Sequence, residues 1–124
     1  MILISKESLA PVHFETLRNA HRTNAGALVP QITFCLFLCR GIRRSIDIEQ
    51  IAAQAGSTYP GDFLTWVNGE PVPDLALILL VLNEAKSPEW RYAIGDWYNG
   101  WHLTKKGLRF AKDVERRKLL TRDH

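Results

Sequence analysis

Two groups of basic side chains, far apart in the chain, are the residues of this sequence best suited to chemistry with a partner. They comprise Arg40, Arg43 and Arg44 in the middle of the chain, and Arg91, Lys105, Lys106 and Arg109 near its end. Trp97 and Tyr98 lie within the second group. Cations beside aromatic rings suit contacts with phosphates and with stacked bases. We therefore expect a nucleic-acid-binding patch where the two groups meet on one surface.

The positive charge is concentrated at the end of the chain. Residues 1–89 contain 7 Lys plus Arg against 9 Asp plus Glu, a net charge of −2. Residues 90–124 contain 9 against 4, a net charge of +5. A basic end attracts nucleic acid or an acidic protein, but it is equally typical of the solvated face of a helix. Asp113 and Arg117, spaced i, i+4, favour the second interpretation.

The spacing of cysteine and histidine does not predict a metal site. Cys35 and Cys39 lie one helical turn apart without further ligands, and we expect two buried thiols. His13 and His21 also lack a third ligand nearby, which favours positions at the surface or at the edge of the core.

The sequence also lacks the patterns that accompany common catalytic sites. It contains no G-x-x-x-x-G-K-S/T loop, no G-x-S-x-G elbow and no H-E-x-x-H helix. His102 lies on a predicted strand and has no identifiable acid or base partner. We therefore expect a protein that is not an enzyme, with no catalytic residue, cofactor or metal.

Length and composition indicate one globular domain. A chain of 124 residues with 46% hydrophobic and 23% charged residues is ordinary for a soluble protein. The longest apolar run, from Leu75 to Leu82, is much shorter than the roughly 20 residues of a membrane span. The N-terminus, MILISKES, lacks the basic segment and the cleavage site of a secretory signal. These features predict a cytoplasmic protein without a membrane segment.

Hydrophobic periodicity predicts a mainly helical chain. The expected helices cover residues 8–26, 30–43, 47–56, 60–67, 74–85, and the chain from 104 onward. Asp47 is expected to cap the third helix, with Gly56 ending it, and Asn68 with Gly69 to end the fourth. The helices at 30–43 and 74–85 have almost no polar side. This pattern indicates either a homodimer interface or the centre of a monomeric core.

Alternating apolar residues predict one β-hairpin before the last helix. Its expected inward side chains are Trp90, Tyr92, Ile94, Trp101 and Leu103. Asn99 and Gly100 suit a two-residue type I′ turn, and a longer loop beginning at Gly95 is the alternative. Trp66 is expected in the core, as are Trp90 and Trp101, whereas Trp97 is the tryptophan expected at the surface.

Two stretches resemble winged helix-turn-helix regulators. IDIEQIAAQAG, at 46–56, is similar to their second helix and turn, and WHLTKKGLRFA, at 101–111, is similar to their last wing strand and following helix. The resemblance covers residues 28–114. It implies a mainly α fold with a small β-hairpin, namely a winged-helix-like core of five to six helices plus a wing. Residues 1–27 then form an N-terminal helical extension and 115–124 a basic C-terminal tail of the same domain.

This resemblance implies a DNA-binding protein that regulates transcription or a phage or mobile-element process, acting as a homodimer on double-stranded DNA. The recognition helix of such proteins enters the major groove, and here it would be the helix at 57–68. Thr58, Tyr59 and Thr65 would contact bases. The wing tip at 96–99, with Trp97 and Tyr98, would lie along the backbone or the minor groove. The residues expected to hold phosphates are Arg43, Arg44, Lys105, Lys106 and Arg109.

An alternative class of function follows from the charges of that helix. Residues 57–68 contain no Lys or Arg and do contain Asp62, with Glu70 just beyond. Affinity for DNA depends largely on basic groups that neutralise phosphates. The alternative is therefore a non-enzymatic protein-interaction module, such as an adaptor, an inhibitor or a complex subunit, on the same scaffold.

Overall fold

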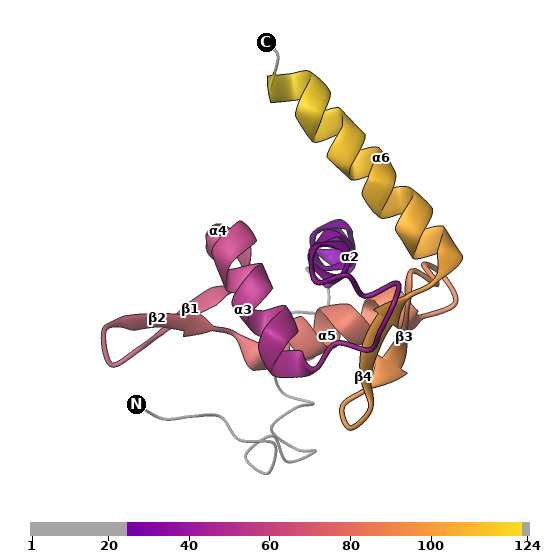
Figure 1. The fold of residues 1–124 in the computed structure, drawn as a ribbon. Coiled ribbons are helices and arrows are strands. Elements are labelled where there is room, and N and C mark those ends of the chain that lie inside the picture. Colours follow the sequence, from indigo (N-terminus) through magenta and orange to yellow (C-terminus); the bar gives the residue numbers. More distant parts are fainter. Residues whose placement is uncertain (1–24, 123–124) are drawn as a thin grey trace.

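The computed structural model describes residues 25–122, which form five helices and two antiparallel sheets of two strands each (Figure 1). The elements are α2 (Val29–Leu38), α3 (Ile48–Thr58), α4 (Pro60–Phe63), β1 (Leu64–Val67), β2 (Glu70–Pro73), α5 (Leu75–Lys86), β3 (Ala93–Asp96), β4 (Gly100–Leu103) and α6 (Lys105–Arg122). The predicted combination of helices with a late hairpin is confirmed. Nearly all of the helix expected at 8–26, including His13 and His21, lies outside the described residues.

Helices α2 and α5 form the centre of the hydrophobic core. α2 packs against α3, α5 and α6, and α5 is buried from Ala76 through Leu82. Asp74 begins α5 as expected, because its side chain accepts a hydrogen bond of 3.2 Å from the backbone N–H of Leu77. Most residues of both helices are buried, which explains why neither helix has a polar face. Their composition therefore requires no second subunit.

α2 ends earlier than the sequence predicts. The expected helix ran to residue 43, but the last helical residue is Leu38. Arg40 adopts a left-handed conformation with φ of 64°, and the N–H of Gly41 donates to the carbonyl of Leu36 at 2.8 Å. A second bond runs from the N–H of Arg40 to the carbonyl of Phe37 at 3.0 Å. This pair of bonds is a Schellman motif, which ends the helix one turn before the arginines.

α3 begins at the predicted cap. The carboxylate of Asp47 accepts a 2.8 Å hydrogen bond from the N–H of Gln50. The expected end at Gly56 is wrong, because α3 continues to Thr58. The φ of Gly56 is not positive, so this glycine does not adopt the left-handed conformation that closes a helix. The expected apolar stripe is confirmed and consists of Ile48, Ile51, Ala52 and Ala55.

The expected recognition helix at 57–68 is wrong. The segment contains the end of α3, the short α4 and the strand β1, which pairs with β2. Asn68 and Gly69 have φ of 52° and 79°, and two successive positive values form a two-residue turn that suits a hairpin. The carbonyl of Phe63 accepts from the N–H of Asp74 at 2.8 Å, which closes the base of the hairpin. Asn-Gly therefore reverses a strand here instead of ending a helix.

The predicted hairpin is present as β3 and β4. The turn contains three residues, 97–99, so the longer-loop alternative holds and the two-residue turn is wrong. Gly100 has φ of 85°, and a Cβ there would lie 3.0 Å from the carbonyl oxygen of Ile46. Trp101 and Leu103 face the core as expected, but Ile94 faces outward beside His102. Inward-facing Ala93 replaces Ile94 because the strand begins one register position away from the expected one.

The tryptophans differ from expectation at two positions. Trp101 is buried, with 1% of its surface exposed, and Trp90 is half-buried against the core, as predicted. Trp66 is 70% exposed on β1 and is not a core residue. Trp97 is half-buried against the core, and Trp66 is the exposed indole instead. The sequence did not predict the hairpin at 64–73. Trp66 shares a hairpin face with Leu64, whose side chain lies next to Gly56 of α3, but Trp66 is two residues closer to the hairpin turn.

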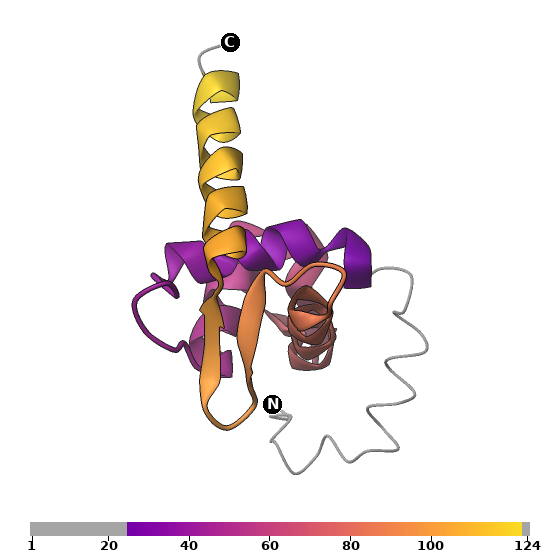
Figure 2. The ribbon, with the colours of Figure 1, turned by 90° about the vertical axis from the view of Figure 1, so that its right-hand side faces the viewer.

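α6 and the β1–β2 hairpin extend from the body in different directions (Figure 1). α6 rises from the base of the β3–β4 hairpin, and its far end stands away from the body (Figure 2). No helix among residues 25–122 has the length and apolar character needed to cross a membrane.

Candidate nucleic-acid interface

The loop between α2 and α3 carries the first group of cations and is bound to the β3–β4 hairpin. Ile46 and Trp101 exchange two backbone hydrogen bonds of 2.8 Å, and the N–H of Leu103 donates to the carbonyl of Gly41 at 3.0 Å. Figure 2 shows the loop beside the hairpin, with α6 rising from the hairpin base. The side chains of Arg43 and Arg44 are exposed. The loop that carries the arginines in the middle of the chain is thus held against β4, the strand that leads into α6.

The second group of cations begins at the first turn of α6, which Thr104 fixes in place. Its hydroxyl donates to the carbonyl of Arg91 at 2.6 Å and accepts from the N–H of Gly107 at 3.0 Å. The second bond caps the helix and satisfies one of its free N–H groups. The three basic side chains expected to contact phosphates on this helix, Lys105, Lys106 and Arg109, are all exposed.

The outer side of α6 carries a basic stripe. Gly107 and Ala111 face the body and are buried. The opposite side carries Lys105, Arg109, Lys112 and Arg116, at positions i, i+4, i+7 and i+11. At about 1.5 Å per residue, these four side chains extend over roughly 16 Å of helix. Asp113 was expected to pair with Arg117. Its carboxylate pairs with Arg116, whose guanidinium lies 2.6 Å away.

Aromatic rings lie beside the start of α6. Tyr92 stacks on Phe110 with ring centroids 4.8 Å apart, and the ammonium of Lys106 lies 5.5 Å from the centroid of Tyr92. A cation over an aromatic face is attracted by the ring quadrupole. This contact keeps Lys106 close to the hairpin base, on one flank of the basic stripe.

The tip of the β3–β4 hairpin is exposed and held by a carboxylate. Asp96 accepts hydrogen bonds from the N–H of Asn99 at 2.7 Å, from the side-chain amide of Asn99 at 3.0 Å and from the N–H of Tyr98 at 2.9 Å. The bonds from Asn99, and then the one from Tyr98, lower the pKa of Asp96. Tyr98 is 88% exposed at this tip. This carboxylate at the hairpin tip therefore orders the turn that presents an aromatic ring.

The residues expected to contact bases do not share a helix face. Thr58 ends α3, where its hydroxyl accepts from the amide of Gln54 at 2.8 Å. Tyr59 is half-buried and packs edge-on against Phe63, with centroids 6.4 Å apart, and burial raises its pKa. Thr65 lies on β1. These three side chains therefore do not form the reading edge of a recognition helix.

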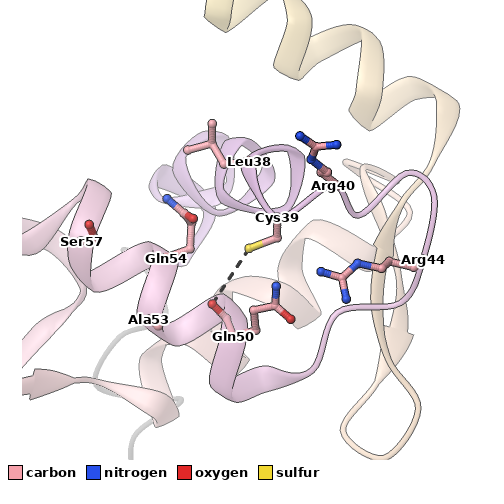
Figure 3. Close-up of a pocket in the computed structure, with 8 residues that line it drawn as sticks. All are labelled: Leu38, Cys39, Arg40, Arg44, Gln50, Ala53, Gln54 and Ser57. Carbon is pink, nitrogen blue, oxygen red and sulfur yellow. Dashed lines mark hydrogen bonds between the residues drawn. The ribbon is translucent and has the colours of Figure 1, made fainter.

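A pocket that the sequence did not predict lies between the end of α2 and the outer side of α3 (Figure 3). It has a volume of about 420 Å³ and is lined by Leu38, Cys39, Arg40, Arg44, Gln50, Ala53, Gln54 and Ser57. Among the described residues, neither Arg40 nor Arg44 forms an ion pair. Helical spacing in the sequence already indicates that Gln50, Gln54 and Ser57 share one side of α3. The sequence does not indicate that the turn after α2 brings the two arginines opposite them.

Both cysteines are buried thiols, as expected. Removal from water, and then the neighbouring Cys39 thiol, raise the pKa of Cys35 to about 12, although Lys118 opposes this shift. Burial also raises the pKa of Cys39, although Arg44 opposes this shift. Among residues 25–122, no three side chains of His, Cys, Asp or Glu are grouped as metal ligands would be.

Charge is separated along the chain. Residues 45–85, which contain α3, α4 and the β1–β2 hairpin, include no Lys or Arg but six carboxylates. The basic groups described above lie in the loop before this segment and in the hairpin-helix unit after it. No family model, curated protein or solved structure matches this chain, so its own residues are the basis for assigning a function.

Proposed function

We propose that this protein binds double-stranded DNA through the phosphate backbone, using the arginine loop and the basic side of α6. The supporting observation is that backbone hydrogen bonds join the loop of Arg43 and Arg44 to the hairpin from which α6 begins. Cations from two distant parts of the chain thus lie on adjoining elements. Neutralisation of phosphates by such groups supplies most of the affinity of non-specific DNA binding.

The order of elements supports a winged-helix interpretation. α2, the bridging residue Ile46, α3, α5 and the β3–β4 hairpin follow one another as the helices, first strand and wing of that fold do. In this interpretation, α4 and the β1–β2 hairpin are an insertion between the second and third helices. The third helix, which enters the major groove in such proteins, corresponds to α5 and not to the segment at 57–68.

The composition of α5 determines the expected mode of binding. From Ala76 through Leu82 this helix is buried, and among its residues only Asn83 and Lys86 are exposed. Base recognition in the major groove requires side-chain donors and acceptors, and α5 has few to offer. We therefore propose contacts to the backbone from Arg43, Arg44, Lys105, Lys106 and Arg109, with Tyr98 at the wing tip, in a regulator of transcription or of a mobile element.

A salt titration tests this proposal. The affinity for a fluorescent DNA duplex, measured by anisotropy, is expected to fall steeply with salt, and replacing one phosphate contact lowers the slope of log K against log salt by about 0.9. Arg109→Glu reverses one charge on the outer side of α6. Lys118→Glu is the matched control, because the ammonium of Lys118 lies 5.1 Å from the ring centroid of Phe34, on the side that faces α2.

The proposal predicts that Arg109→Glu weakens binding far more than Lys118→Glu. Absence of duplex binding at low salt, or equal effects of the two reversals, would refute it. Circular dichroism measures the helix content of both variants, which is expected to equal that of the wild type if α6 is retained.

The alternative function, a protein-interaction module, is favoured by one observation, the exposure of Trp66 on a hairpin without cations. Exposed tryptophans are enriched at protein interfaces. Recovery of a stoichiometric protein partner after nuclease treatment would support this alternative, and loss of every partner under that treatment would count against it.

A further inference from the structure

The β1–β2 hairpin presents an indole that the other described residues leave largely uncovered. Trp66 lies opposite Pro71 in the hairpin and is 70% exposed. Pro71, its cross-strand partner, is also exposed, whereas Val67 and Val72 lie on the other face of the hairpin and are half-buried. The hairpin extends away from the body (Figure 1). Trp66 is therefore placed as the anchor of an intermolecular contact.

The composition of β2 limits how a partner binds. Pro71 and Pro73 alternate along this strand. Proline occurs in edge strands where its missing N–H would face away from the sheet. The outer edge of β2 thus lacks the donors that strand addition requires. At this edge a partner consequently contacts the hairpin through side chains, and we place Trp66 in a recess of that partner.

The charge of the segment that carries Trp66 defines the chemistry of that recess. Glu70 lies beside the hairpin turn, Asp62 lies in α4, and no cation occurs between residues 45 and 85. A complementary surface has basic groups around an apolar floor, because cations attract both carboxylates and the face of an indole.

The pocket between α2 and α3 has these properties. Leu38 and Ala53 supply apolar surface, and Leu38 is 38% exposed. Arg40 and Arg44 lie at the pocket without ion pairs to any described carboxylate (Figure 3). The amide of Gln50 lies within the same lining and offers an acceptor for an indole N–H. The volume of about 420 Å³ is ample for one indole ring.

We infer that the β1–β2 hairpin of one copy docks in the Arg40–Arg44 pocket of a second copy. The hairpin and the pocket are separate surfaces of one chain, because the pocket is lined by residues between 38 and 57 and the β1–β2 hairpin extends away from the body (Figure 1). The contact joins two different patches, so it is heterologous and adds copies head to tail into a ring or a chain. Opposite charges across the interface make the association sensitive to salt.

Sedimentation velocity of the pure protein without DNA tests this inference. At low salt the average mass is expected to rise above the 14.1 kDa monomer as concentration increases, and to return toward it in high salt. Trp66→Ala is expected to weaken association by about 30-fold or more, as loss of an interface anchor does. Tyr98→Ala is the matched control, because it removes an exposed aromatic ring from the other hairpin, and it leaves the mass distribution unchanged.

A mixing experiment distinguishes this interface from a symmetric dimer. Trp66→Ala retains the pocket, and a chain with Arg40→Glu and Arg44→Glu retains the hairpin. Each variant alone is expected to be monomeric, and the mixture to form a 1:1 complex that grows no further. A wild-type protein that is monomeric at every concentration overturns the inference, as does a Trp66→Ala protein that still self-associates.

A charge exchange adds a second criterion. Glu70→Arg alone and Arg44→Glu alone weaken association, and the two changes in one chain restore it. No restoration in the double variant, with both single variants impaired, overturns the pairing of these surfaces. DNA affinity is measured separately on Trp66→Ala, so a failure of self-association and a failure of DNA binding remain distinguishable.

Discussion

Helix propensity and tertiary packing act in opposite directions on the stability of a protein in which Gly107 is replaced by alanine. Gly107 lies in the first turns of α6, where Gly→Ala normally stabilises a helix by about 1 kcal/mol. In the folded protein a Cβ at this position would overlap the carbonyl oxygen of Tyr92. It would also lie 2.9 Å from the carbonyl carbon of Tyr92 and 3.1 Å from Cδ2 of Leu103. The nearest obstacle is backbone, which a rotamer change cannot relieve.

The expected magnitude follows from three effects. Overpacking of this kind costs about 1–3 kcal/mol. The carbonyl of Tyr92 also accepts a 3.0 Å hydrogen bond from the N–H of Thr104, and its displacement weakens a bond worth about 1 kcal/mol. Against the helix-propensity gain of about 1 kcal/mol, the net loss of unfolding free energy is about 2 kcal/mol.

Urea unfolding followed by tryptophan fluorescence measures this difference. Gly61→Ala in α4 is the matched control, since a Cβ there meets nothing within 4 Å and the φ of Gly61 is not positive. The control is expected to be neutral or to stabilise the protein by up to about 1 kcal/mol. A Gly107→Ala protein as stable as the wild type would show that α6 does not pack on Tyr92 as the structure has it.

Two further predictions concern side chains whose burial the structure defines. Trp101→Ala is expected to lower the unfolding free energy by about 3–5 kcal/mol, because Trp101 is 1% exposed. Trp66→Ala is expected to change the unfolding free energy by no more than about 0.5 kcal/mol. Similar losses for the two variants in a denaturant titration would contradict the burial of Trp101 and the exposure of Trp66. Cys35, with its pKa raised to about 12, is expected to resist alkylation by iodoacetamide at neutral pH and to react once the chain is unfolded. Rapid modification of Cys35 in the native protein, located by mass spectrometry, would contradict its burial.

Local sequence signals predicted several elements correctly. The Asp47 cap needs only its own side chain and the N–H of a residue three positions later, so it is readable from neighbouring residues. The starts of α5, after Asp74, and of α6, after Thr104, also agree with the expected helix ranges, which began at 74 and 104. Alternation around Trp101 and Leu103 indicated the late hairpin because adjacent strand residues point to opposite faces.

The prediction failed where one local signal has two structural uses. Asn68-Gly69 ends helices and also forms hairpin turns, and the pairing of β1 with β2 decides between them. Trp66 appeared to be a core residue because it is apolar and has apolar neighbours, whereas its exposure depends on which face of β1 is covered. With the helix at 57–68 replaced by a hairpin, Thr58, Tyr59 and Thr65 lost the common face expected of them.

The sequence by itself determined the separation of charge and the Asp47 cap of α3, because these depend on residue type and on neighbours within one turn. Only the tertiary structure decided that the arginine loop adjoins α6 and that Arg40 and Arg44 lie opposite α3. The bridge between Ile46 and Trp101 joins residues more than 50 positions apart, a pairing that short-range periodicity does not encode. The exposed position of Trp66 has the same origin, since burial is a property of the packed chain.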